Sequence, residues 1–145
     1  MLVELILLGF IPLIIFRKLK KINNKTSLFK KKDCNFSLLL ADAAEVKKLN
    51  IKFRKKNKTT DILSFPFHEK KNLNKLLKKK SKIYLGDIVI NLNKIKKAAK
   101  NESFNLAFDK IWIHGLAHLL GHRHKSNIDY SIMSNLENKL LQFSK

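Results

Sequence analysis

Residues 104–124 read FNLAFDKIWIHGLAHLLGHRH, and they predict the central element of the fold. Gly121 is a typical helix stop. The apolar residues before it recur at helical spacing, which indicates one buried side made up of Phe104, Ala107, Phe108, Ile111 and Trp112. We therefore expect a long amphipathic helix over Phe104–Leu120 that packs against the core of the protein.

Four of the five histidines lie at the end of this helix, between positions 114 and 124. His114 and His118 are four residues apart, so both rings project from the same helix face. Because Gly121 lets the chain turn back, His124 can approach the same point from a loop. His122 could join His114 and His118 instead of His124 if the helix continues through Gly121. We favour His124 as the third member of the cluster.

The pattern His-x3-His-x5-His predicts a metal site with three nitrogen ligands. Three protein ligands leave a fourth position for water, which is the arrangement of catalytic zinc. A bound Zn²⁺ lowers the pKa of that water to about 7 and supplies hydroxide at neutral pH. Three neutral imidazoles also accept nickel, copper or cobalt. We expect one zinc ion per chain.

The same spacing occurs in the HExxHxxGxxH motif of the metzincin proteases, including the glycine at position 121. At position 115, however, this chain has Gly where those proteases have a general-base glutamate. Without that carboxylate, the attack of water on a peptide bond has no proton acceptor. A phosphodiester needs less help, since its anionic oxygens bind metal and arginine. A metallopeptidase remains the alternative.

Length and composition predict one folded domain over residues 1–145, with 45% hydrophobic residues and a net charge of +20. The charge favours a polyanionic partner, although the Lys excess also fits an AT-rich genome. Arg17, Arg54 and Arg123 are more informative, because arginine binds phosphate bidentately. A single cysteine, Cys34, allows no intrachain disulfide, so nothing argues for an oxidising compartment.

The N-terminal apolar run, MLVELILLGFIPLIIF, is too short for a bilayer span of roughly 20 residues and is broken by Glu4, Gly9 and Pro12. A secretory signal carries its positive charge before the apolar core, whereas RKLKK follows it here. We predict a strand at Leu2–Leu8, a turn, a helix at Leu13–Ile22, and no membrane anchor.

The remaining elements alternate between strands and helices along the chain. Residues 69–82 are Lys-rich and predict an exposed loop or a short helix. Strands are predicted at Phe36–Leu40, Asp61–Phe67 and Ile83–Ile90. A helix is predicted from Asp42 to Arg54, with Ala43, Val46, Leu49 and Phe53 at helical spacing. A second is predicted from Asn91 to Lys100. A third begins at Ser126 or Asn127, and its apolar side consists of Ile132, Met133, Leu136 and Leu140. This order indicates an α/β (α+β) domain, with a small mixed four-stranded sheet, about five helices packed over it, and the metal site at the end of the long helix.

HGLAHLLGHRH resembles the HGxLHLxGYDH signature of the YbeY-type endoribonucleases, the rRNA maturation factors of bacteria and organelles. LNIKFRKKNKTTDILSFPF, residues 49–67, is similar to the LNxxYRxxxxPTDVLSFPF of that family, and LGDIVIN, residues 85–91, to its LGDIxIs. Met133 and Glu137 lie where the last helix of the family has a similar Met and Glu. The resemblance covers the chain from about Phe36 to Leu141.

The resemblance implies a cytoplasmic, zinc-dependent, single-strand-specific endoribonuclease that acts in 16S rRNA 3′-end maturation and ribosome quality control. In this reading, metal-activated water attacks an RNA phosphodiester. The implied metal ligands are His114, His118 and His124, and the implied basic residue of the active-site cleft is Arg54. A guanidinium near a zinc hydroxide can also hold a phosphate on general grounds, whereas the alternative for Arg54 is a solvated helix end.

The implied partners are rRNA, the ribosome and a single-stranded RNA substrate, and ribosomal proteins or a GTPase are compatible with this reading. Lys70–Lys82 either holds the RNA backbone, which predicts salt-dependent binding, or is a solvated surface. From the family motif, Thr60, Asp61 and Ser64 are expected to shape the cleft through hydrogen bonds rather than to act in catalysis.

The chain departs from the family pattern at two places. His122 and Arg123 stand where the family has Tyr-Asp, and Thr59 stands in place of a proline. An aspartate can orient a metal ligand by accepting a hydrogen bond, which Arg123 cannot do. Arg123 either adds a phosphate contact or repels the metal. A ribosome-binding factor with a weakened catalytic site is therefore a further hypothesis.

Overall fold

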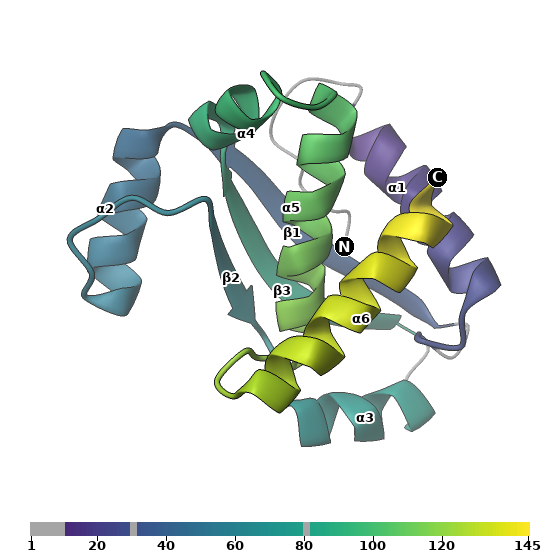
Figure 1. The fold of residues 1–145 in the computed structure, drawn as a ribbon. Helices are drawn as coiled ribbons and strands as arrows, with labels where there is room; N and C mark the ends of the chain where they lie inside the picture. Colours follow the sequence, from purple (N-terminus) through teal and green to yellow (C-terminus); the bar gives the residue numbers. More distant parts are fainter. Residues whose placement is uncertain (1–10, 30–31, 80–81) are drawn as a thin grey trace.

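The computed structural model describes residues 11–29, 32–79 and 82–145, and these form alternating helices and strands (Figure 1). The bounds of the elements, in chain order, are α1 Ile11–Lys25, β1 Asp33–Ala41, α2 Ala43–Arg54, β2 Ile62–Pro66, α3 Lys70–Lys79, β3 Lys82–Asn91, α4 Leu92–Ala98, α5 Phe104–Leu119 and α6 Asn127–Ser144.

The described strands form one mixed three-stranded sheet in the order β1-β3-β2. The central strand β3 pairs in parallel with β1, placing Ile88 opposite Leu38, and antiparallel with β2, placing the same residue opposite Ser64. Three of the four predicted strands and the mixed pairing are therefore confirmed. The fourth, predicted at Leu2–Leu8, lies outside the described residues.

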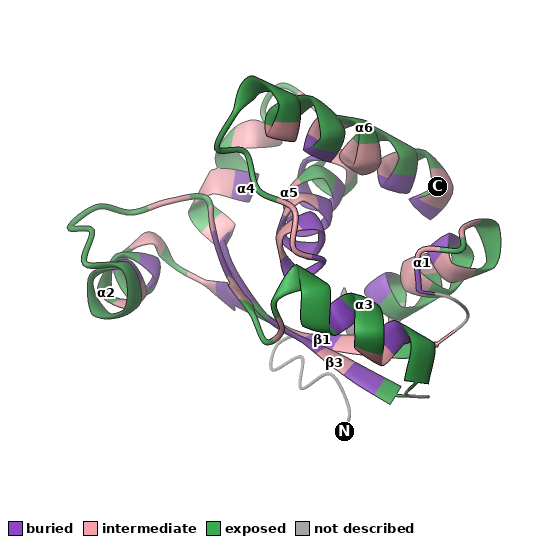
Figure 2. Ribbon diagram, turned by 90° about the horizontal axis from the view of Figure 1, so that it is seen from below, coloured by how far each residue is buried: buried purple, intermediate pink, exposed green. Residues whose placement is uncertain are grey.

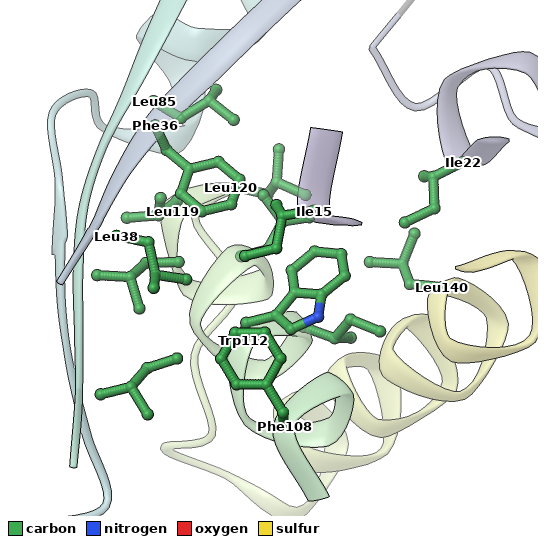
Figure 3. Packing of buried hydrophobic residues seen from close by; sticks show 14 of the residues in the cluster. Ile15, Ile22, Phe36, Leu38, Leu85, Phe108, Trp112, Leu119, Leu120 and Leu140 are labelled. Carbon is green, nitrogen blue, oxygen red and sulfur yellow. The ribbon is translucent and has the colours of Figure 1, made fainter. Parts of the chain in front are cut away.

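Helix α5 covers one face of the sheet and carries the centre of the core (Figure 3). Trp112 is fully buried, and its indole nitrogen donates a hydrogen bond to Asp109 over 2.9 Å. Leu38 and Ile88 face the same cluster from the sheet. Burying each of these large side chains contributes about 1.5–3 kcal/mol. The predicted long helix is confirmed, and its end is fixed relative to the sheet.

Helix α2 packs against the opposite face of the sheet (Figure 2). A smaller cluster of buried residues forms there between Val46 of α2, Leu63 of β2 and Val89 of β3. The three sites are almost completely screened from solvent. Helices α2 and α5 therefore lie on different faces of the sheet, and both contact strand β2.

The predicted helix starts are confirmed by their capping bonds. The carboxylate of Asp42 accepts a hydrogen bond from the Glu45 backbone N–H over 2.8 Å. At the start of α6, Ser126 and Asp129 exchange two bonds, each side chain accepting from the backbone of the other. Side chains that satisfy free N–H groups in this way stabilise a helix start by about 1 kcal/mol.

Residues 69–82 contain a helix, α3, which buries Leu73 and Leu77 against the main core. This outcome matches the second of the two predicted alternatives, and the described residues hold six helices where about five were predicted. Three side chains predicted on buried sides are exposed: Phe53 at 56%, Phe104 at 40% and Ile132 at 50%. Helical spacing alone placed these three side chains wrongly, because it does not show which part of a helix surface the neighbouring elements cover.

Among the described residues, no helix combines the length and the apolar content that a membrane span requires. Helix α1 instead buries Ile15 and Ile22 in the core, and the ammonium of Lys18 pairs with the buried carboxylate of Asp109. Cys34 packs partly buried against the same core, and this burial raises the pKa of its thiol to about 12. The thiol therefore stays protonated at neutral pH.

Candidate metal centre and cleft

The last two turns of α5 position two of the candidate ligands, His114 and His118. The helix ends as predicted at Gly121, which has a φ of 85°. A side chain is strained at this φ, and a Cβ there would lie 2.6 Å from the Cβ of Lys70. The turn at Gly121 brings His124 back over the helix end. The path of the chain here therefore depends on a position whose backbone conformation and close contacts suit only glycine.

The imidazoles of His114, His118 and His124 form a cluster whose candidate ligand atoms all lie within 4.8 Å of one another. The Nε2 atoms of His114 and His118 are 3.2 Å apart. Tetrahedral zinc with Zn–N bonds of about 2.0–2.1 Å separates its nitrogens by about 3.3 Å. The distance between these two nitrogens therefore fits a shared zinc ion. The ring of His122 is not part of the cluster.

Two hydrogen bonds fix which nitrogen of each helical imidazole faces the cluster. The backbone carbonyl of His122 accepts a hydrogen bond from Nδ1 of His118 over 2.9 Å. Glu137 of α6 accepts one from Nδ1 of His114 over 2.7 Å. Protonation at Nδ1 leaves the Nε2 lone pair of each ring available for a metal. His122 therefore serves the site through its carbonyl oxygen.

The environment also keeps His118 uncharged. Burial lowers the pKa of His118 to about 4, positive charge on neighbouring imidazoles and on Arg54 adds to this effect, and the hydrogen bond to the His122 carbonyl opposes it. A pKa this low means that the imidazole is neutral at neutral pH. Because a histidine must be neutral to bind a metal, His118 needs no deprotonation before it can act as a ligand.

Gly115 lies on the side of α5 that faces the sheet, away from solvent. A Cβ at this position would lie 2.7 Å from Cδ1 of Ile62 and 2.9 Å from Cδ1 of Ile88. The packing therefore leaves no room for the glutamate that the metzincin motif carries here. The base that a metallopeptidase needs is missing, and the position that would hold it is filled by the core.

The histidine cluster opens into a cavity of about 470 Å³ between the end of α5 and β2. Three cationic side chains share this cavity with the imidazoles: Arg54, Arg123 and Lys125. Ser64 also lines the cavity, but its hydroxyl is buried, and among the described residues no hydrogen-bond partner reaches that hydroxyl. The remaining residues that line the cavity are Thr60, Ile62, Pro66, His114, His118 and His124.

Arg54 reaches this cavity from the last residue of α2. Its Nη2 donates a hydrogen bond to the backbone carbonyl of Ser64 over 3.0 Å, and its guanidinium lies 6.0 Å from the ring centre of Phe65. These two contacts hold the exposed guanidinium of Arg54 at the cavity. The structure thus brings together Arg54 and the three histidines, which lie about sixty positions apart in the sequence.

The loop before β2 is tied down by Asn91, a buried residue at the end of β3. Its amide nitrogen donates to the Thr59 hydroxyl and to the Thr60 carbonyl, both over 3.1 Å. Its backbone N–H donates to the carbonyl of Asp61 over 2.9 Å. These bonds hold the backbone carbonyls of Thr60 and Asp61, and of these two residues Thr60 lines the cavity. Asn91 was predicted only as a helix cap, which it also is, because sequence spacing does not reveal a bond across thirty residues.

A smaller cavity of about 170 Å³ lies on the other side of His114 and His124. Its other lining residues come from α6 and are Tyr130, Met133, Ser134 and Glu137. The contact between Glu137 and His114 was not predicted from the residues. The signal available was the resemblance in the last helix, together with the spacing that places Met133 and Glu137 on one helix side.

The family model described as Endoribonuclease YbeY matches residues 14–145. A protein named Endoribonuclease YbeY from Buchnera aphidicola subsp. Acyrthosiphon pisum is 44% identical over 117 residues, which are 79% of this chain and 71% of that protein. A protein of the same name from Pelagibacter ubique is 43% identical over 133 residues, covering 90% and 82%. A Thermotoga maritima protein solved in solution has a TM-score of 0.61 at 23% identity, covering 94% and 85%, and supports the fold.

Proposed function

This chain belongs to the YbeY endoribonuclease family, and we therefore propose that it is a zinc-dependent, single-strand-specific endoribonuclease. Its proposed substrate is the 3′ end of 16S rRNA, and its proposed role is in rRNA maturation and ribosome quality control in the cytoplasm. The proposal treats residues 1–145 as one catalytic domain.

One observation carries the proposal: Arg54 lines the same cavity as His114, His118 and His124. Three clustered imidazoles, two of them with Nε2 free, suit one metal ion, and the guanidinium beside them suits a phosphate. A peptide bond has no anionic oxygen for an arginine to hold, whereas a phosphodiester has two. The donor set therefore favours phosphodiester hydrolysis over the alternative of a metallopeptidase, and the buried Gly115 supports the same choice.

The three histidines are the proposed ligands. Zinc, when bound there, supplies a hydroxide at neutral pH. Arg54 holds the non-bridging oxygens of the scissile phosphate and stabilises the negative charge that develops on them. Its hydrogen bond to the Ser64 carbonyl orients the guanidinium before the substrate arrives.

Two features support a single strand as the substrate. A cavity of about 470 Å³ is of the size that takes a small part of one strand and not a double helix. Arg123 and Lys125 are exposed at the same cavity, and we assign them to the phosphates that flank the cleavage site. In this reading Arg123 adds a phosphate contact, in place of the acidic residue of the family motif.

The proposal is tested by measuring the metal content of the purified protein by mass spectrometry, together with cleavage of an RNA that contains a 16S 3′ end. The variants are His114→Ala and the matched control His122→Ala, which removes a histidine of the same motif whose ring lies outside the cluster. Arg54→Lys keeps the charge at the cleft and removes the planar fork.

We expect one zinc ion per chain in the wild type and in His122→Ala, and loss of both zinc and cleavage in His114→Ala. Arg54→Lys should retain zinc and cleave at least tenfold more slowly. A wild type that contains zinc, binds ribosomes and cuts no RNA would instead make the chain a ribosome-binding factor. Hydrolysis of casein would favour the metallopeptidase, and a wild type without metal would overturn the proposal.

A further inference from the structure

The strand β2 separates two surfaces of different chemistry. Side chains alternate along a strand, and Ser64 and Pro66 line the metal cleft. Phe65 therefore points to the other face of the sheet, the face on which α2 packs, and Phe67, which directly follows β2, packs against Tyr84 of β3. Within the described part of the chain, β2 is an outer strand of the sheet, so its free edge joins the two surfaces.

An aromatic cluster covers this second surface. Phe53 of α2 lies edge-on to Phe65, with ring centres 5.3 Å apart, and Phe67 lies edge-on to Tyr84 of β3, with ring centres 5.7 Å apart. We call these four residues the aromatic platform. Phe53 is 56% exposed and Phe67 is 68% exposed, so both rings offer large apolar areas to solvent. Such exposed groups of rings usually mark a binding surface.

Cations lie directly beside the rings of the platform. The ammonium of Lys52 is 5.2 Å from the ring centre of Phe53, and the guanidinium of Arg54 is 6.0 Å from that of Phe65. Lys55 and Lys56 follow and are exposed. Asp87, the acidic residue in contact with the platform, accepts a hydrogen bond from the Tyr84 hydroxyl over 2.6 Å. The surface thus combines stacking faces with mostly positive charge.

The platform is continuous with the metal cleft through Arg54. The same guanidinium lies over a platform ring, binds the carbonyl of Ser64 on β2, and lines the cavity that holds the histidines. A strand of nucleic acid that leaves the cleft past Arg54 therefore meets Phe65 and Phe53 next. The cations suit its phosphates, and the exposed rings suit its bases.

We propose that the aromatic platform, Phe53, Phe65, Phe67 and Tyr84, is a base-stacking site for single-stranded RNA that extends the substrate path from the metal cleft around the edge of β2. This inference rests on the proposed endoribonuclease function. Unpaired bases stack on aromatic side chains whatever their sequence, and alanine substitution of one such ring typically weakens binding roughly 5- to 150-fold. The platform would therefore increase affinity for long RNAs without selecting their sequence.

The test compares the binding of RNAs of different lengths to the full chain loaded with zinc, by fluorescence anisotropy. The probes are oligouridines of about 4 and about 12 nucleotides, and a duplex RNA whose bases are not free to stack. The variants are Phe53→Ala, Phe67→Ala and the conservative Phe53→Tyr. The matched control is Phe16→Ala on α1, since Phe16 is 55% exposed and has the ammonium of Lys20 at 5.2 Å from its ring centre.

We expect Phe53→Ala and Phe67→Ala each to weaken binding of the long oligouridine about tenfold and to leave the short one and the duplex within twofold of the wild type. Phe53→Tyr should bind as the wild type does, and so should Phe16→Ala. Because Phe53 and Phe67 are mostly exposed, both variants should keep their zinc content and melting temperature.

The platform is overturned if the two variants bind the long oligouridine as tightly as Phe16→Ala does, or if they lose equal affinity for the short and the long RNA. It is also overturned if Phe16→Ala weakens binding as much as they do. A wild type that cleaves and binds RNA in these cases leaves the proposed function intact. A wild type that neither binds nor cleaves single-stranded RNA overturns both.

Discussion

Replacing Glu137 with alanine should weaken the binding of zinc without unfolding the protein. The carboxylate of Glu137 accepts a hydrogen bond from Nδ1 of His114 over 2.7 Å, and both side chains are about 30% exposed, at 28% and 32%. This bond fixes the ring so that Nε2 faces the cluster. Groups that orient a ligand in this way contribute a factor of about 10–100 in metal affinity, which corresponds to about 1.4–2.8 kcal/mol.

The variant Glu137→Gln separates the hydrogen bond from the charge. A glutamine oxygen still accepts from the imidazole, but a neutral acceptor forms a bond roughly half as strong as a carboxylate does. We therefore expect a loss of affinity about half as large in free energy as that of Glu137→Ala. Ser134→Ala is the control, because Ser134 lines the same small cavity one helical turn earlier and lies outside the histidine cluster.

The affinity is measured by titrating the metal-free protein with zinc in competition with a chromophoric chelator, and urea unfolding of the same samples reports the stability of the fold. We expect the order wild type, Glu137→Gln, Glu137→Ala from tightest to weakest, with Ser134→Ala equal to the wild type. The reasoning is refuted if Glu137→Ala binds zinc within twofold of the wild type. It is equally refuted if Ser134→Ala loses as much affinity.

Three further predictions concern the stability of the fold. The folded-state pKa of His118, about 4, is below the ordinary value of 6.5, so between these pH values the unfolded chain binds a proton that the folded chain does not. The free energy of unfolding of the metal-free protein should therefore fall as the pH is lowered from about 6.5 to about 4, and His118→Asn should flatten this dependence in urea titrations at each pH. Gly86→Ala should destabilise the protein by about 3 kcal/mol or more, since the φ of Gly86 is 134° and a Cβ would lie 2.2 Å from the Phe65 carbonyl oxygen. Urea unfolding measures this loss, and a loss below about 1 kcal/mol would contradict the observed pairing of β2 with β3. Lys18→Met should lower the free energy of unfolding by about 2–4 kcal/mol, because it leaves the buried Asp109 carboxylate with only the Trp112 indole as a described partner. Amide hydrogen exchange should rise first in α1, and exchange that rises equally everywhere would argue against this local role.

The histidine cluster of the candidate metal site could be predicted from sequence because its determinants are local. His114 and His118 are related by helical spacing, and the turn that returns His124 depends on Gly121 a few residues away. The same is true of the helix caps at Asp42 and Ser126, whose bonds span three residues. Short-range geometry of this kind is fixed by backbone dihedrals and hydrogen bonds that any chain with these residues would form.

The partners of the site depend on long-range packing, which periodicity does not report. Arg54 joins the histidines because β2 pairs with β3 and because α2 ends at the edge of β2. Glu137 reaches His114 because α6 crosses the end of α5. Phe53 was predicted as a core residue, since helical spacing does not show where the sheet ends. Only the resemblance to the family had linked Arg54 to the cleft.

The chemistry of the cleft follows from how closely α5 approaches the sheet. At Gly115 the helix is so near β2 and β3 that a Cβ would lie 2.7 Å from Ile62, which excludes the glutamate of a metallopeptidase at that position. The same approach places the following turn of α5 beside the outer strand, where the Ser64 carbonyl holds Arg54. The cleft therefore lacks a carboxylate base at position 115 and holds a guanidinium beside the histidines. A site with this balance suits a substrate that is itself negatively charged, and for that reason it suits RNA better than a peptide.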